Sequence, residues 1–100
     1  MQSLDFDWDP EKARSNAAKH GVRFEEAMTV LRDPLSLTIF DEAHSGNEER
    51  WITLGLANSE RLLVVVHTFD ERDDQVYIRI ISARIATSRE QRQYRESPST

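Results

Sequence analysis

The stretch Leu62-Leu63-Val64-Val65-Val66-His67-Thr68-Phe69 decides the fold of this 100-residue chain. Its unbroken apolar run, too short to cross a membrane, indicates a central strand that is covered on both faces. A polar turn at Asp70 to Asp74 follows, and then a second strand from Val76 to Ala83. Before the central strand, the sequence has a strand from Arg50 to Leu56 and a turn at Asn58-Ser59. These segments predict an antiparallel sheet.

Helices flank this sheet on both sides in the sequence. The N-terminal segment begins with a short strand, in which Leu4, Phe6 and Trp8 alternate with aspartates. A helix from Pro10 to His20 follows, because Asp9 can cap it, Pro10 suits its first turn and Gly21 can end it. A second helix starts at Phe24, with Arg23 as a poor cap, and stops at Pro34.

The remaining segments complete the predicted fold. Leu35, Leu37 and Ile39 have the period of a half-buried strand, and an acidic loop, 41–49, separates that strand from Arg50. Thr87-Ser88-Arg89-Glu90 is a capping box that opens a C-terminal helix. The expected order is β-α-α-β-β-β-β-α, an α+β fold with an antiparallel sheet, two N-terminal helices and one C-terminal helix. We expect one domain, 1–95, and a disordered tail, 96–100.

Composition and charge limit the possible functions. The chain has no cysteine, which excludes disulfides and cysteine-based zinc sites, and no secretory or membrane-spanning segment, so we expect it in the cytoplasm. Its formal net charge of −5 argues against a nucleic-acid binder. Between residues 79 and 95, however, five arginines face a single acid, Glu90. Arginine suits bidentate phosphate contacts, although a solvated helix face explains this charge equally well.

The last strand carries the first candidate site. Strict alternation puts Val76, Ile78, Ile80 and Ser82 on one face and Tyr77, Arg79, Ile81 and Ala83 on the other. Arg50, Arg79 and His67 could then converge on one sheet face. Cleaving RNA without a metal needs such a set, with a group of near-neutral pKa to move protons and arginines to stabilise the phosphorane. The alternative for Arg79 is a surface residue that keeps its charged end in solvent, and the alternative for His67 is a hydrogen-bonded core residue.

Two further clusters are weaker candidates. Lys12, Asn16 and His20 share one stripe of the first helix, with Lys19 adjacent, although a solvated face with a cationic C-terminal end explains them as well. His44 lies among acidic residues, but the spacing matches no zinc or calcium loop, and no phosphate-binding glycine loop is present. We therefore expect neither a metal nor a cofactor.

Several motifs, in order, resemble those of the BrnT toxins over about residues 6–95. They are Phe6-Asp7-Trp8-Asp9-Pro10-Glu11-Lys12, Asn16, Lys19-His20-Gly21-Val22, Phe24-Glu25-Glu26-Ala27, Glu49-Arg50, Gly55, Leu63 to Thr68, Arg79 to Arg84, Ala86, Arg89-Glu90 and Tyr94. The chain departs from the commonest pattern at Arg23, where a small capping residue is usual, and at Ile85 and Gln91, where basic residues are frequent. The last two departures remove positive charge beside the expected site.

The resemblance implies a RelE-like ribonuclease fold and a toxin that inhibits growth and translation by metal-independent cleavage of RNA. It implies catalytic roles for His20, Arg50, His67, Arg79 and Arg84, with Arg79 and Arg84 on the scissile phosphate, Arg50 on the transition state and a histidine moving protons. Lys12, Lys19 and Arg89 are the expected RNA contacts. A BrnA-like antitoxin would neutralise the toxin, in a 2:2 complex, and would supply all DNA binding. The alternative is a catalytically inactive module that serves as a scaffold for that partner.

Overall fold

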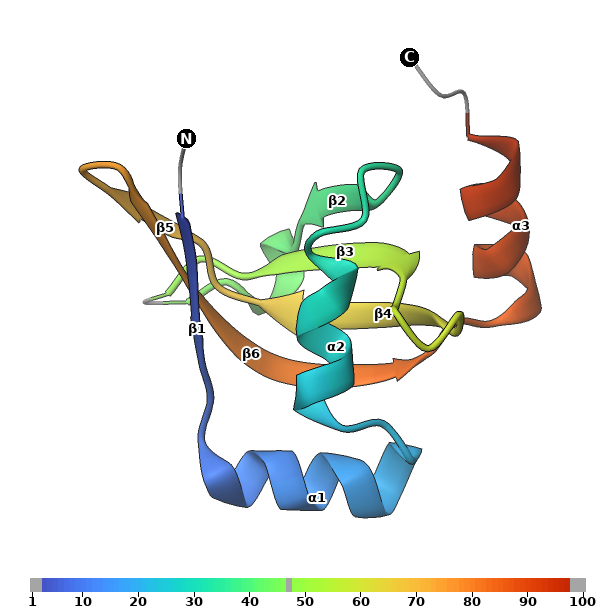
Figure 1. The fold of residues 1–100 in the computed structure, drawn as a ribbon, viewed down its shortest axis with the longest axis horizontal. Coiled ribbons are helices and arrows are strands. Elements are labelled where there is room, and N and C mark those ends of the chain that lie inside the picture. Colours follow the sequence, from blue (N-terminus) through green and yellow to red (C-terminus); the bar gives the residue numbers. More distant parts are fainter. Residues whose placement is uncertain (1–2, 47, 98–100) are drawn as a thin grey trace.

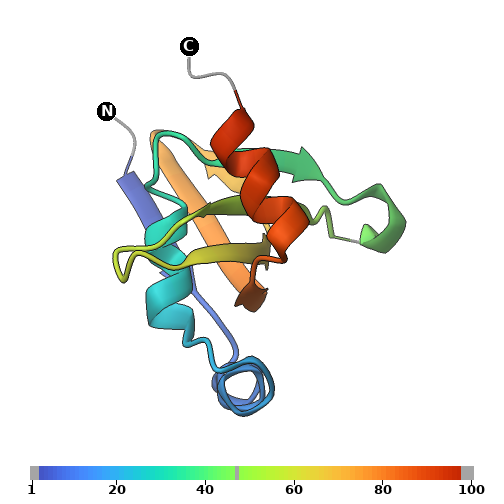
Figure 2. The same ribbon diagram turned by 90° about the vertical axis from the view of Figure 1, so that its right-hand side faces the viewer.

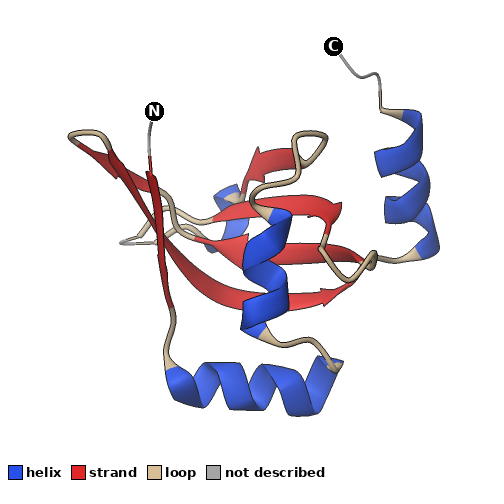
Figure 3. Ribbon diagram, viewed as in Figure 1, coloured by secondary structure: helices blue, strands red, loops and turns tan. Residues whose placement is uncertain are grey.

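The computed structural model describes residues 3–46 and 48–97. These residues form a mixed sheet and three α-helices. Figures 1 and 3 show how the helices lie around the sheet. None of the helices in the described ranges has the length and apolarity that crossing a membrane requires. In chain order the elements are β1 Ser3–Asp7, α1 Pro10–His20, α2 Phe24–Val30, β2 Leu37–Phe40, the 3-10 helix η1 Glu42–His44, β3 Trp51–Leu56, β4 Leu62–His67, β5 Asp70–Arg72, β6 Gln75–Ile85 and α3 Ser88–Glu96.

The α+β prediction is confirmed, but the sheet is not purely antiparallel. Its strand order is β1-β6-β4-β3-β2, and β5 pairs with β6 beside this path. The N-terminal strand β1 runs parallel to β6, with Phe6 opposite Ile78 and Asp7 opposite Arg79. Alternation of apolar side chains reports which face of a strand is buried and not the direction of its neighbour. The sequence pattern therefore could not predict this parallel pair.

Two segment boundaries also differ from the prediction. The expected polar turn at 70–74 contains strand β5, whose three residues are all exposed and so carry no apolar alternation. Strand β2 starts at Leu37 and not at Leu35, because Asp33 holds the preceding residues in a turn. The Leu35 amide donates to Asp33 Oδ1, and the Ser36 amide donates to the Asp33 carbonyl. The helix α3 runs to Glu96, and residues 98–100 of the expected tail lie outside the described residues.

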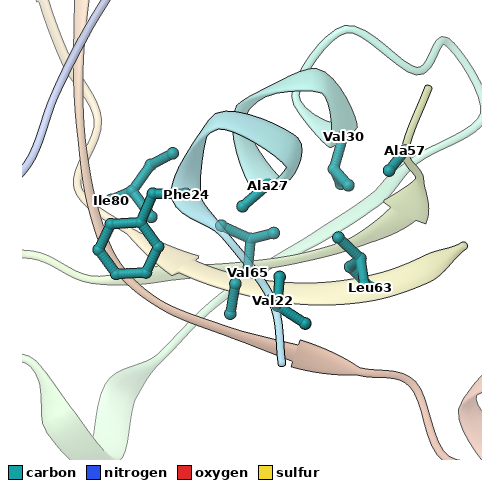
Figure 4. Packing of buried hydrophobic residues seen from close by; sticks show 9 residues of the cluster. Val22, Phe24, Ala27, Val30, Ala57, Leu63, Val65 and Ile80 are labelled. Carbon is teal, nitrogen blue, oxygen red and sulfur yellow. The ribbon is translucent and has the colours of Figure 1, made fainter. Parts of the chain in front are cut away.

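Helices α1 and α2 cover one face of the sheet and enclose the main core. Phe24, Val30, Leu63 and Val65 are fully buried there, and Figure 4 shows α2 packed over β4 and β6. A smaller cluster of Leu54, Val64 and Ala86 lies on the opposite face, where Tyr94 of α3 packs against it. In Figure 1, α3 stands at the end of the sheet far from β1, and Figure 2 views the molecule from the α3 side. Helices α1 and α2 thus cover the centre of one face, and α3 covers part of the other.

A β-bulge in β6 changes which side chains share a face. Val66 pairs with Ser82, but the next residue, His67, pairs with Ile80, so Ile81 has no partner in β4. As a result Ile80 and Ala83 both enter the main core, although strict alternation assigns them to opposite faces. The predicted grouping of Ser82 with Ile80 and of Ala83 with Arg79 is therefore wrong. The bulge brings Arg84 to the face of the sheet on which Arg79 lies.

Asn16 joins α1 to the sheet. Its side chain is buried, and its Nδ2 donates to the carbonyls of Val22 and Ala83, each at 2.9 Å. Its Oδ1 accepts from the Ala83 amide at 3.1 Å. Asn16 thus continues the pairing of β6 beyond the point at which β1 ends. Three backbone groups depend on this one amide.

Replacing Asn16 with alanine should destabilise the protein by about 2–3 kcal/mol or more, because it leaves buried backbone groups without partners. Urea unfolding, followed by circular dichroism, measures this change. The exposed neighbour Ser15→Ala serves as the control and should change stability by no more than about 0.5 kcal/mol. Equal midpoints for the two variants would show that the Asn16 hydrogen bonds are not important for stability.

Candidate active site

A surface pocket opens where β1 and β6 lie side by side at the edge of the sheet. Its volume is about 480 Å³, and it combines charged groups with two partly exposed aromatic rings, Phe69 and Tyr77. Strands β1 and β6 form one wall, and the end of β4 with the start of β5 forms another. The lining consists of Asp5, Phe6, Asp7, Glu48, Glu49, Thr68, Phe69, Asp70, Arg72, Tyr77, Ile78 and Arg79. Of the residues predicted to form the catalytic site, this lining contains Arg79.

Arg79 reaches the pocket because its neighbours Ile78 and Ile80 fill the core on the other face of β6. Its Nε lies 3.4 Å from Asp7 Oδ1, the side chain directly opposite on β1. Both side chains are more than half exposed, at 57% for Arg79 and 67% for Asp7. Thr68 fixes the Arg79 backbone, since its amide donates to the Arg79 carbonyl and its hydroxyl accepts from the Arg79 amide. Arg79 is therefore held at its main chain and open at its guanidinium.

Arg84 lies on the same face of β6 but is engaged by α3. Its two terminal nitrogens donate to the two carboxylate oxygens of Glu90, at 2.8 and 2.9 Å. Glu90 also accepts from the Thr87 amide and so closes the predicted capping box. The hydrogen bonds from Arg84 lower the pKa of Glu90 to about 2. Four residues lie between the two arginines on β6, which puts their Cα atoms roughly 15 Å apart. Arg84, paired with Glu90, is not part of the pocket lining.

His67 does not converge with Arg79, contrary to the expectation. It is 1% exposed and faces the α1 and α2 side of the sheet, opposite Ile80 and Trp51. Its Nδ1 lies 2.9 Å from the Thr68 carbonyl, which can only accept, so this nitrogen carries the proton. Its Nε2 then accepts from the Thr53 hydroxyl at 2.7 Å. A neutral ring with its proton on Nδ1 thus satisfies both contacts.

The hydrogen bonds of His67 extend towards the surface. The Thr53 hydroxyl oxygen lies 2.8 Å from the hydroxyl of the exposed Thr38, which donates to it if Thr53 donates to His67. Burial lowers the pKa of the His67 imidazole, because desolvation disfavours the charged ring. The hydrogen bond to the Thr68 carbonyl opposes this effect. His67 is thus a satisfied core residue, which is the alternative that the sequence left open.

The other predicted site residues are spread over the molecule. His20, Lys12 and Lys19 belong to α1, which packs on the face opposite to Arg79. Arg50 follows the pocket residue Glu49, and its amide donates to the Ser45 hydroxyl. Arg89 is exposed in the first turn of α3. The structure therefore does not bring these residues together around Arg79.

The other side chains of the pocket, chiefly Asp7, Phe69 and Tyr77, are not among the site residues that the sequence predicts. Phe69 lies between β4 and β5, and Tyr77 lies two residues before Arg79 on β6. Only the parallel pairing of β1 with β6 brings Asp7 beside Arg79. Within residues 3–46 and 48–97, no three side chains of the metal-binding types lie close enough to hold a metal ion. The useful signal was the alternation of aspartates with apolar residues in β1, which indicates an exposed acidic face.

The lowered pKa of His67 makes a prediction about stability and pH. In the unfolded chain His67 takes up a proton at about pH 6.5, whereas burial disfavours this protonation in the folded protein. The free energy of unfolding should therefore fall as the pH drops below about 6.5. Unfolding midpoints at pH 7.5 and 5.5 test this, with His67→Gln as the comparison. The difference in stability between the two proteins should shrink at pH 5.5, and a constant difference would refute the assignment.

Comparison with known proteins identifies the family. Residues 8–90 match the family described as "Ribonuclease toxin, BrnT, of type II toxin-antitoxin system". No curated protein matches the chain. The fold is similar to that of the ribonuclease toxin BrnT of Brucella abortus, with a TM-score of 0.59 and 22% identity, over 86% of this chain and 100% of that chain. The relation to RelE stays a prediction. With four fifths of its length matched, the chain belongs to the BrnT family of ribonuclease toxins from type II toxin–antitoxin systems.

Proposed function

We propose that this chain is a toxin that cleaves RNA without a metal and that the scissile phosphate binds to Arg79 in the pocket. The observation that carries this proposal is the state of the Arg79 guanidinium. It borders a pocket of about 480 Å³, and within the described residues its two terminal nitrogens have no partner. A planar guanidinium with free terminal nitrogens suits a phosphate, and more strongly the extra charge of the phosphorane.

The remaining expected residues take supporting roles in this proposal. His67 holds the end of β4 through the Thr68 carbonyl, and Thr68 in turn fixes the main chain of Arg79. Arg84 reaches a neighbouring phosphate only if RNA replaces Glu90. Arg50 and Arg89 contact the RNA outside the pocket. The geometry gives no support for His20, Lys12 and Lys19 at the scissile bond, because α1 covers the opposite face.

Membership of a type II family implies an antitoxin partner. We propose that it is a BrnA-like protein that binds DNA, forms a 2:2 complex with the toxin and covers Arg79. The half-exposed Phe69 beside Arg79 favours such a contact, since a partner that enters the pocket buries an apolar ring together with the guanidinium.

A second candidate function is that of a scaffold without catalysis. The pocket lining supports it, because five carboxylates surround two arginines there and repel an approaching RNA. The two candidates differ in a simple way. A scaffold binds the antitoxin and leaves RNA intact, whereas the toxin cleaves RNA when the antitoxin is absent.

The purified chain should cleave single-stranded RNA in the presence of a metal chelator. Arg79→Ala should lower the rate by about 100- to 1,000-fold, as expected when a donor to a developing negative charge is lost. The matched control is Arg92→Ala, an exposed arginine of α3 that should keep the parent rate. Intact RNA with the parent protein would favour the scaffold function.

Binding to the antitoxin gives a separate prediction for the same two variants. Arg79→Ala should speed dissociation of the complex by an amount worth about 2–5 kcal/mol, because it leaves a buried charge of the partner without its counterpart. Arg92→Ala should instead slow association slightly and lose this effect at high salt. Surface plasmon resonance at two salt concentrations measures both rates. An unchanged dissociation rate for Arg79→Ala would mean that the antitoxin leaves the pocket open.

A further inference from the structure

Cleaving RNA through its own 2′-hydroxyl requires a proton acceptor beside the group that binds the phosphate. None of the three histidines meets this need. His67 is buried with both ring nitrogens bonded, and His20 lies at the end of α1 on the other side of the sheet. His44, in η1, places its Nδ1 3.2 Å from Asp41 and is not part of the pocket. The acceptor must therefore be sought among the side chains around Arg79.

Asp7 is the carboxylate that lies closest to the Arg79 guanidinium. The two residues are register partners on the parallel strands β1 and β6, so their side chains leave the sheet side by side. One contact joins them, from Arg79 Nε to Asp7 Oδ1 at 3.4 Å, and both are mostly exposed. Oδ2 of Asp7 has no partner within the described residues. The pair is thus open towards the pocket at both of its ends.

The pocket also has room for the nucleotide that carries the 2′-hydroxyl. Its volume is about 480 Å³, and Phe69 and Tyr77 give it aromatic surface on which a base can stack. Arg72 already lies over the Tyr77 ring, 4.3 Å from its centre, and pairs with Asp70 at 3.0 Å. Phe69, by contrast, remains 48% exposed and open to a base. A phosphate on the terminal nitrogens of Arg79 then brings the adjoining ribose near Asp7.

We propose, on the basis of the function proposed above, that Asp7 is the general base of the reaction. Its carboxylate takes the proton of the 2′-hydroxyl while the 2′-oxygen forms a bond to phosphorus. The bond between phosphorus and the 5′-oxygen breaks, and the 5′-oxygen keeps the electron pair and takes a proton from water. Asp7 then returns its proton to water, so no proton is gained or lost overall. The products are a 2′,3′-cyclic phosphate and a 5′-hydroxyl.

The charges around Asp7 bear on how this base works. Arg79 on β6 lies beside the carboxylate, while Asp5 on β1, Asp70 on β5 and the loop residues Glu48 and Glu49 add negative charge to the same pocket. These acids weaken long-range attraction of RNA and leave Arg79 as the main anchor. We therefore expect slow association with RNA, and a chemical step that depends on the pair of Asp7 and Arg79.

The test compares Asp7→Asn with Asp73→Asn, the same change in the turn between β5 and β6. Asparagine at 7 can still accept from Arg79 Nε but cannot take a proton. Asp7→Asn should lower the single-turnover cleavage rate of a short RNA by about 100- to 10,000-fold, while RNA affinity stays equal or rises. Asp73→Asn should keep the parent rate, since asparagine tolerates the positive φ of 57° at this position.

The pH profile separates a base from a residue that only orients Arg79. A carboxylate base still accepts protons at about pH 5.5, where an imidazole base is mostly protonated, so the parent should retain its rate there. Asp7→Glu should restore part of the rate that Asp7→Asn loses. If the parent and Arg79→Ala both leave RNA intact, the proposed function fails. If the parent cleaves, Arg79→Ala does not and Asp7→Asn does, then only the assignment of Asp7 is wrong.

Discussion

The unpaired residue Ile81 determines the chemistry of both faces of β6. Without the bulge, residues 79 and 84 would point to opposite faces, since strand side chains alternate with a period of two. With it, Ile80 and Ala83 close the core, Asn16 pairs with the Ala83 backbone, and Arg84 reaches Glu90. The position of α1, the attachment of α3 and the common face of the two arginines all depend on this single extra residue.

The two arginines on that face are in different electrostatic states. Arg84 forms a bidentate ion pair with Glu90, and Glu90 also caps α3, so the charge of Arg84 stabilises the fold. Arg79 makes one contact to an exposed carboxylate, and an exposed pair of this kind contributes little to stability. A charge that the fold does not need is available for a ligand. This difference is a stronger guide to the site than the number of arginines in the segment.

The sequence predicted the local structure well and the tertiary arrangement less well. The Asp9 cap, the Gly21 end of α1 and the Thr87–Glu90 capping box are confirmed, because each depends on residues within one helical turn. The parallel β1–β6 pair and the bulge at Ile81 could not be predicted, since both depend on partners far away in the chain. Arg79 could be predicted as a site residue from its own strand. Asp7 could not, because its place beside Arg79 depends on the parallel pairing. His67 was misplaced because its polar partners, Thr53 and Thr68, were not visible as a network.

The pairing of β1 with β6 also governs when the pocket can exist. One of its walls is the strand pair formed by residues 5–7 and 77–79, so β1 must wait for a partner that lies 72 residues later in the chain. A chain that is still being translated carries Asp7 long before it carries Arg79, and it has no pocket in the meantime. For a member of a ribonuclease toxin family, this topology means that the ribosome releases most of the protein before the candidate site is assembled.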